Sequence, residues 1–524
     1  MISQKTIVVS FSISALIVTL LCFAFQPQWN TNDDIAMSMV AHGYGLAAYG
    51  SPNLVFSNVI WGYLVRTIPE INSVLGYSIA TLSMIVLVGT ALIYGLLSLN
   101  VNLITTLALA VLLLTRPVLF PQFTINSGLL MVAAVICWQL YPIKQHKLPL
   151  LAGCMLAYLS YLIRSRETLL ILILALPLID WRYFFSKNTA KIAFLTLLMA
   201  IAISALIDRQ HYLGSEWQAF KTFNSLRASF TDHDAGTYLK QHPDILAQHH
   251  FSPNDVDLST AGFFIDPTIG NPITLQAMIN ELGPLSKQND LITKAAEGLK
   301  KIGHPDLLPL FAVAFLLLIL HPNKRLFLSW ILVISAIAII STLGRPGVLR
   351  VYIPMVSLLV IAPFFFTQDE NMTRNRLASV IIIISSLFNS STVLTKNQSA
   401  SSTSERVRQN TKEFPHSPVI LWGTNLLIHS YPVLKQSPSA LSYQLNGLGV
   451  FNLAPYSVAT AEKKLHNPID QLMSEAGLSV ITPQYRIGLL QNYCKEHFNG
   501  DLKYLSNTPF GELKLQRLKC ELKE

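Results

Sequence analysis

Charged residues are scarce in this chain. Of its 524 residues, 13% are Asp, Glu, Lys or Arg and 51% are hydrophobic, whereas a soluble domain carries about 25% charged residues. Apolar runs of about 20 residues, the length that crosses a bilayer, recur along the chain. These features exclude an ordinary soluble protein and indicate a protein that crosses the membrane many times. No small-residue cleavage pattern follows the first run, from Ile7 to Phe25, so we expect a retained helix there instead of a signal peptide.

The apolar runs predict about eleven transmembrane helices. They lie near residues 6–26, 74–98, 101–119, 125–141, 148–163, 167–180, 190–207, 306–320, 326–343, 350–366 and 377–394. The formal net charge is +9, but the basic residues gather in short loops between the runs, as the positive-inside rule expects, so we exclude nucleic acid as a partner. This charge pattern predicts a cytoplasmic N-terminus and places the C-terminal part on the outer face of the membrane.

Cysteine is also rare, with five residues in the chain. Cys22, Cys137 and Cys154 fall in predicted helices, where they fit as packing residues. Cys494 and Cys520 lie in the part expected outside the cell, where an oxidising compartment would permit a disulfide between them. Their spacing alone does not decide between a disulfide and two free thiols.

The hydrophilic parts of the sequence predict two units. Residues 1–395 form a membrane module with two long outer loops, 27–73 and 208–305, and residues 396–524 form a small α/β domain that follows a polar linker at 399–404. In the first loop, the segments 35–43 and 54–68 predict two helices on the membrane surface. In the second, His249-His250 and Asp232-His233-Asp234 lack the spacing of a metal site, so we do not expect a metal ion in this loop.

Ionisable residues are almost absent from the interiors of the predicted membrane helices, and this argues against an ion-coupled transporter. Charges gather at the outer helix ends instead. Asp33 and Asp34 follow the first helix, and four arginines stand at two later outer turns: Arg164, Arg166, Arg345 and Arg350. An arginine fork suits a phosphate, and a carboxylate can deprotonate a hydroxyl. The alternatives are that Asn32 or Asp33 only caps a helix and that each arginine only extends to the membrane surface.

Taken together, these motifs resemble the GT-C superfamily of membrane glycosyltransferases, in particular protein O-mannosyltransferases and lipid A aminoarabinose transferases. Asp33-Asp34 before two surface helices is similar to the acidic pair in the first outer loop of that family. The Leu349-Arg350-Val351-Tyr352-Ile353-Pro354 segment is similar to its Arg-Tyr-hydrophobic-Pro motif, although the aromatic residue here comes one position later. A Ser51-Pro52-Asn53 turn also stands where relatives often have Pro-Pro-Leu.

The resemblance implies inverting transfer of a sugar from a polyprenyl-phosphate donor to a glycan, lipid or protein acceptor on the outer face, which would be the periplasmic side of a bacterial inner membrane. It also implies that no metal cofactor is required, although a divalent ion remains an alternative. Asp33 or Asp34 would act as general base, and Arg164, Arg166, Arg345, Arg350 and Tyr352 would hold the donor phosphate. The alternatives are a glycan polymerase or ligase, a flippase for lipid-linked glycans, and a membrane scaffold without catalysis.

Overall fold

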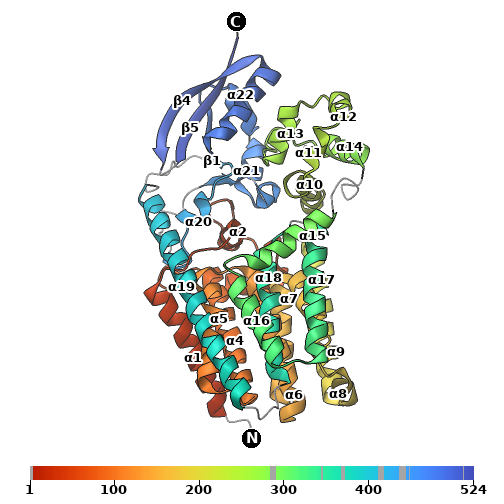
Figure 1. Ribbon diagram of the computed structural model, residues 1–524. Helices are drawn as coiled ribbons and strands as arrows, with labels where there is room; N and C mark the ends of the chain where they lie inside the picture. Colours follow the sequence, from red (N-terminus) through yellow and green to blue (C-terminus); the bar gives the residue numbers. More distant parts are fainter. Residues whose placement is uncertain are drawn as a thin grey trace.

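The computed structural model describes residues 4–283, 291–343, 346–366, 372–410, 418–435, 444–447, 449–465, 467–510 and 513–523. The protein is a bundle of long helices that carries a layer of smaller elements at one end (Figure 1). The N-terminus lies at the opposite end of the bundle, and the C-terminus lies at the far side of the layer. We call the end of the bundle beneath the layer the domain end.

The bundle confirms the predicted fold class of a multi-pass membrane protein. Seven of the described helices are long and apolar enough to cross a bilayer, or eight if the bent pair discussed below is one span. Each of the eleven predicted spans coincides with helical structure, and the helices are α1 (Gln4–Ala24), α4 (Gly76–Ser98), α5 (Leu103–Leu119), α6 (Phe123–Lys144), α7 (Lys147–Ala175), α9 (Asn188–His211), α16 (Leu308–Leu320), α17 (Lys324–Leu343), α18 (Leu349–Ile361) with η3 (Ala362–Phe365), and α19 (Met372–Asn410).

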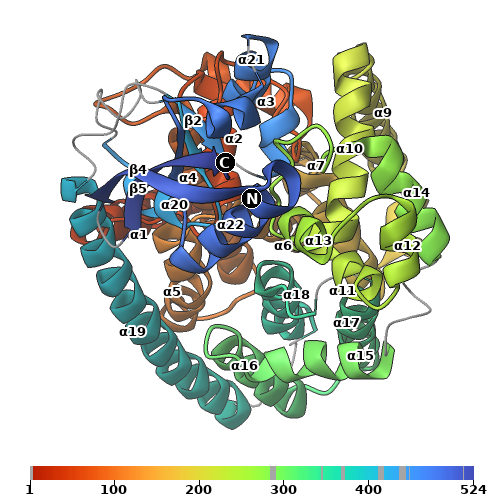
Figure 2. The same cartoon turned by 90° about the horizontal axis from the view of Figure 1, so that it is seen from above.

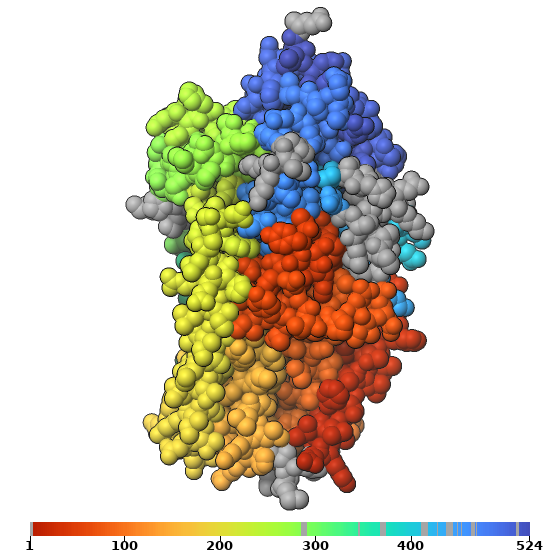
Figure 3. Space-filling view, turned by 180° about the vertical axis from the view of Figure 1, so that it is seen from behind, coloured from red at the N-terminus to blue at the C-terminus, as the bar shows by residue number. Residues whose placement is uncertain are grey.

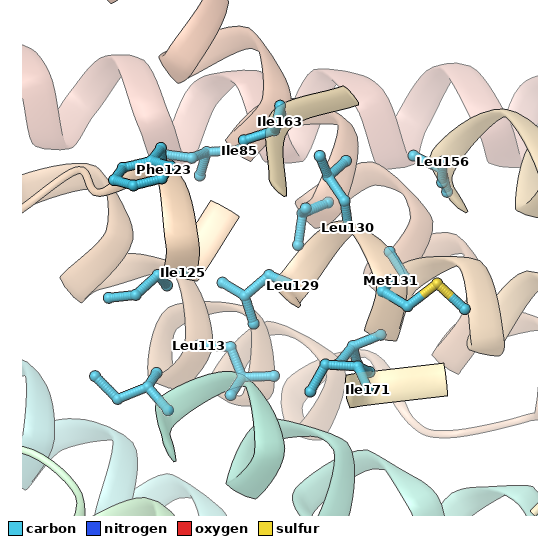
Figure 4. Close-up of a cluster of buried hydrophobic side chains, with 14 of the residues drawn as sticks. Ile85, Leu113, Phe123, Ile125, Leu129, Leu130, Met131, Leu156, Ile163 and Ile171 are labelled. Carbon is cyan, nitrogen blue, oxygen red and sulfur yellow. The ribbon is translucent and has the colours of Figure 1, made fainter. Parts of the chain in front are cut away.

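Burial differs sharply between the central and outer helices of the bundle. The apolar stretch of α6 that is long enough to cross a bilayer is entirely buried. Its residues pack in a cluster with side chains of neighbouring helices, as Figure 4 shows around Leu129 and Leu130. By contrast, α1 and α9 expose large apolar side chains such as Phe23 and Ile192. A helix that is apolar all round is either buried by protein or faces lipid, so these outer surfaces are the ones that meet the bilayer.

Helix α7 contains the two predicted spans 148–163 and 167–180 and folds back on itself between them. Arg164 has non-helical backbone angles (φ −161°, ψ 98°). The hydroxyls of Ser160 and Thr168 lie 2.7 Å apart, although eight residues of straight helix would separate them by about 12 Å. Gln139, near the far end of α6, donates to the carbonyl of Leu178. The chain therefore rises to Arg164 at the domain end and then descends, as two spans would.

The segment before α16 lies across the bundle. Helix α15 (Leu291–Lys300) and η2 (Lys301–Gly303) meet α16 at an angle of 87°. Asp306, in the bend, is bound by Arg116 of α5 at 3.0 Å and by Lys396 of α19. Arg116, which the sequence places at an outer helix end, therefore fastens this bend to the bundle.

Three short helices accompany the bundle. Helix α8 (Trp181–Ser186) precedes α9, while α2 (Asn32–His42) and α3 (Val59–Thr67) lie at the domain end, as Figure 1 shows for α2. The predicted surface helices 35–43 and 54–68 correspond to α2 and α3, although the second begins five residues later than predicted. Asn58 caps α3 by accepting a hydrogen bond from the backbone N–H of Ile60.

Residues 212–283 form a small helical unit, which we call the middle segment. It contains α10 (Ser215–Asp232), α11 (Ala235–Leu239), α12 (Pro243–Gln248), α13 (Pro253–Thr260) and α14 (Pro272–Leu282). Its own core includes Phe223, Phe264 and Met278. In the view from above, these helices lie beside the C-terminal domain, over the bundle (Figure 2).

The C-terminal domain is a five-stranded sheet with helices, as the sequence predicts. Its elements are β1 (Val419–Leu421), α20 (Leu426–Ser430), β2 (Leu445–Gly447), η5 (Val450–Leu453), α21 (Val458–Leu465), η6 (Pro468–Met473), β3 (Leu478–Ile481), α22 (Gln484–Phe498), β4 (Gly500–Phe510) and β5 (Leu513–Leu522). The strand order is β2-β1-β3-β5-β4, in which β2, β1 and β3 are parallel and the last two strands are antiparallel. Cys494 and Cys520 form a disulfide between α22 and β5.

One boundary prediction is wrong. Residues 399–404, predicted as a polar linker because they are rich in serine, are helical and belong to α19, which continues to Asn410. This stretch is held against the loop after α1: Ser401 donates to the side chain of Gln26, and Ser404 donates to that of Gln28. Serine favours loops only when no tertiary partner supports the helix.

The C-terminal domain, the middle segment and the bundle pack against one another. Trp422 lies 4.8 Å from Phe263, ring centroid to centroid, and its indole N–H donates to the carbonyl of Ala261. On the bundle side, the backbone N–H groups of Leu445 and Val458 donate to the carbonyls of Gly45 and Leu46. Figure 3 shows the blue C-terminal domain resting on the red residues that include this loop. The loop after α2 therefore ties the domain to the acidic pair.

Candidate active site at the domain end

Helix α2 places the two aspartates in its first turn. The N-cap residue is Thr31, in extended conformation, and its hydroxyl donates to the Asp34 side chain at 2.8 Å. The helix ends at Gly43, whose φ of 73° lies in the left-handed region that glycine adopts at low cost. Acidic side chains in the first turn interact favourably with the helix dipole. Neither Asn32 nor Asp33 is the N-cap, so the capping alternative does not apply to them.

Asp34 is fully buried. One carboxylate oxygen accepts from the backbone N–H of Phe123 at 2.9 Å and from the Tyr77 hydroxyl at 3.2 Å, and the other accepts from Thr31. Burial raises the pKa of this carboxyl to about 7, although all three hydrogen bonds act in the opposite direction. Asp34 thus joins α2 to the ends of α4 and α6.

Asp33 has a different environment. Its side chain is 28% exposed, and its carboxylate lies 3.1 Å from the guanidinium of Arg350, in the first turn of α18. Asp33 also lines a cavity of about 360 Å³ between α2 and the C-terminal domain. Of the two aspartates, Asp33 is therefore the one that a molecule in the cavity can reach.

Arg164 stands at the turn of α7, close to this ion pair. Its guanidinium lies 4.9 Å from the ring centroid of Phe123 and 5.7 Å from that of Phe56, as cation–π contacts do. Its Nε lies 3.7 Å from the buried carboxylate of Glu167, and both Asp33 and Arg350 are within its electrostatic range. Arg164 Nε and Glu167 Oε2 are buried without a hydrogen-bond partner among the described residues, so hydrogen-bonding capacity remains at this site.

The other predicted phosphate ligands fall in different places. Arg166 is exposed and acts electrostatically on Glu167. Arg345 lies outside the described residues. Tyr352 is fully buried, and its hydroxyl lies 2.8 Å from that of Ser341 and accepts from the backbone N–H of Gly347 at 3.3 Å. The phosphate role that the resemblance implied for Tyr352 stays a prediction.

Sequence reasoning missed several residues that build the site. Glu167 directly follows Arg166 in an outer turn and was not selected as a site residue. Tyr77 and Phe123 carry no signal in the sequence because their contacts with Asp34 join residues 43 and 89 positions apart. His42 is a further case: its ring nitrogen accepts from the backbone N–H of Tyr77, and burial, aided by Arg66, lowers its pKa to about 4. His42 is therefore neutral and fixes the junction of α2 with α4.

The side chains that come together as possible metal ligands are not those of the two weak motifs in the sequence. Among the described residues, one set of three could hold an ion: Asp255, Glu496 and His497. His497 and Asp255 are 2.8 Å apart and form an ion pair between α22 and α13, and the Asp255 side chain raises the pKa of His497. His249 pairs instead with Glu281. None of these residues lines the cavity at Asp33.

The fold and the site together define a multi-pass membrane protein with acidic and arginine side chains gathered at one end of its bundle. No protein-family model matches the chain, and no curated protein matches it. Among solved structures, the chain is similar to the crystal structure of ArnT from Cupriavidus metallidurans bound to undecaprenyl phosphate, with 12% identity, 98% of each chain covered and a TM-score of 0.35. Because a TM-score of this size does not establish a common fold, the function proposed for this chain rests on its own residues.

Proposed function

We propose that this protein is a membrane glycosyltransferase that moves a sugar from a polyprenyl-phosphate donor to a hydroxyl at the domain end, on the outer face of the membrane. The observation that carries the proposal is the contact between Asp33 and Arg350, 317 residues apart in sequence, beside a cavity that Asp33 lines. A partly exposed carboxylate close to two arginines supplies a base and an anion site in one place.

The chemistry follows from this arrangement. The acceptor hydroxyl loses its proton to the Asp33 carboxylate as its oxygen attacks the anomeric carbon of the donor sugar. The bond between that carbon and the phosphate oxygen breaks, and polyprenyl phosphate leaves with the bonding electrons. Arg350 and Arg164 would bind the phosphate, where their charge stabilises the leaving group. A single displacement of this kind inverts the anomeric centre, and none of its steps uses a metal.

Asp34 has a separate task in this proposal. Because both of its oxygens already accept hydrogen bonds from Thr31, Tyr77 and Phe123, it positions the first turn of α2 and does not touch the acceptor. The difference in exposure between the two side chains supports this assignment, in which the partly exposed Asp33 is the base and the buried Asp34 holds the helix that carries it.

The test is transfer of labelled sugar by the purified protein in vesicles that contain its native lipid-linked donors. Wild-type protein should form glycosylated product and release polyprenyl phosphate, and Asp33→Asn should lose both activities. Glu70→Gln is the matched control, because Glu70 is an exposed carboxylate outside the site. Translocation of the donor without sugar transfer would favour the flippase alternative, and unaltered transfer by Asp33→Asn would refute the role of Asp33.

A further inference from the structure

The cavity beside Asp33 is built from two distant parts of the chain. The bundle contributes Asn32, Asp33 and Ala36 of α2 together with Leu46. The C-terminal domain contributes the loop 423–425 after β1, four residues at and after the end of β2 (Gly447, Gly449, Val450 and Phe451), and Leu421 and Ser457. The domain therefore forms one wall of the space into which Asp33 projects.

The position of this wall on the sheet is informative. Strands β1 and β2 are parallel, and the residues that line the cavity lie at and beyond their carboxyl ends. Open α/β sheets bind their ligands at the carboxyl ends of parallel strands, where the loops expose backbone and side-chain polar groups. The hydrogen bonds from Leu445 and Val458 to the loop after α2 hold this edge of the sheet next to the helix that carries Asp33.

The lining chemistry separates this cavity from the arginine site. Among the described lining residues, Asp33 is the sole charged side chain, and the others are polar groups such as Asn32, Thr424 and Asn425 or apolar groups such as Phe451. Neither Arg164 nor Arg350 lines it. The side-chain oxygen of Asn32 is buried without a hydrogen-bond partner among the residues that the structure describes, so it can accept a hydrogen bond from a hydroxyl.

We propose that this cavity binds the acceptor, and that the reacting group of the acceptor is a neutral, hydroxyl-bearing sugar. A hydroxyl can donate a hydrogen bond to the Asp33 carboxylate, whereas an ionised phosphate or carboxylate can only accept, and the described cation beside Asp33, Arg350, already forms an ion pair with it. A sugar ring suits both kinds of lining, because its hydroxyls can bond amides and hydroxyls while its C–H face packs on Phe451. The volume of about 360 Å³ falls at the small end of ligand sites. This inference rests on the proposed function, and it assigns acceptor selection to the C-terminal domain.

Two glycines allow the cavity to be filled without a clash. A Cβ added at Gly447 or at Gly449 would meet no atom of the described residues within 4 Å. Because both glycines line the cavity, we expect a larger side chain at either position to occupy the cavity instead of the protein core. Gly488, in α22 of the same domain, has equally open surroundings and does not line the cavity. Gly447→Leu and Gly488→Leu are therefore a matched pair that differ in whether the new side chain occupies the cavity.

The first experiment measures sugar transfer against increasing amounts of envelope extract from the native cells, with endogenous lipid-linked donor labelled by tritiated sugar nucleotides. Gly447→Leu should raise the half-saturating amount of extract at least tenfold while the half-saturating amount of donor stays unchanged, and Gly488→Leu should behave as wild type. Gly449→Ala, a smaller change, should act in the same direction if Gly447→Leu lowers the yield of folded protein. Wild-type dependence on extract in both cavity variants would overturn the inference.

The second experiment identifies the bond that forms. Label that survives mild acid and mild alkali, and that digestion recovers on a neutral sugar, would support the inference. Label released by mild acid indicates a glycosyl phosphate, and label released by mild alkali indicates a serine or threonine acceptor; either result would overturn it. These outcomes leave the glycosyltransferase proposal standing, because that proposal fails only if no sugar is transferred or if Asp33→Asn transfers normally.

Discussion

The division of labour between Asp33 and Asp34 is open to a direct test with two isosteric variants. In Asp33→Asn the amide keeps the shape of the side chain but cannot take a proton from the acceptor. General-base catalysis contributes typically 10²–10⁴-fold in rate, so we expect transfer to fall by about that factor. The ion pair with Arg350 joins side chains that are 28% and 30% exposed, and pairs of this kind stabilise by about 1 kcal/mol or less. The melting temperature should therefore change little.

Asp34→Asn should give the opposite pattern. The retained oxygen can still accept from Phe123 and Tyr77, while the new amide N–H can donate to the Thr31 hydroxyl, which both accepts and donates. We expect a folded protein with transfer within about tenfold of wild type. Asp34→Ala leaves the buried N–H of Phe123 without its acceptor, at a cost of about 1–3 kcal/mol, and should lower the melting temperature.

The assay pairs initial transfer rates with thermal unfolding for the three variants in the same detergent. A larger rate loss in Asp34→Asn than in Asp33→Asn would refute the reasoning from exposure and make Asp34 the base. Equal and complete loss in both would mean that the two carboxylates act as one unit.

Three further predictions concern the site and its support. Arg350→Ala should raise the half-saturating donor concentration about 10- to 100-fold, since a hydrogen bond to a charged group contributes about 1.5–3 kcal/mol; an unchanged value in a donor titration would exclude a phosphate role. Burial raises the pKa of Asp34 to about 7, so the folded protein binds more protons than the unfolded chain between about pH 4 and 7. The free energy of unfolding of the wild-type protein should therefore decrease as pH rises through that window. The melting temperature of Asp34→Asn should therefore increase relative to that of wild type as pH rises, and a difference in melting temperature that does not change with pH would contradict this. Replacing both Cys494 and Cys520 by serine opens a loop with a sequence separation of 26 residues and should destabilise the C-terminal domain by about 3–4 kcal/mol, measured by limited proteolysis over temperature; wild-type resistance would count against it.

Much of the architecture could be predicted because hydrophobicity acts locally along the chain. Every predicted span is helical, and even the return of the chain at Arg164 was indicated by a short charged turn between two apolar runs. The exception at 399–404 is instructive, because serine content predicts a linker while contacts with Gln26 and Gln28 hold a helix. Local preference fails where a distant partner decides the conformation.

Predicting the site was harder for the same reason. Asp33, Arg164 and Arg350 were selected because charge is costly inside a membrane helix, so the few charged residues at the outer helix ends are conspicuous in an apolar sequence. Tyr352 was selected only because of the resemblance of a motif, and its fully buried side chain gives no independent support to a phosphate role. Glu167 and the loops of the C-terminal domain could not be assigned, because ordinary polar residues become significant only through what they face.

By itself, the sequence determined a multi-pass helical membrane protein with a C-terminal α/β domain. The length and period of apolar runs indicate which segments cross the bilayer or are buried, and this information is local in the chain. It also determined that the remaining charge would lie at helix ends. The tertiary structure alone decided which aspartate is accessible, since both stand in one helical turn and differ only in what covers them. It likewise decided that the C-terminal domain forms a wall beside Asp33, because that contact depends on hydrogen bonds between residues some 400 positions apart.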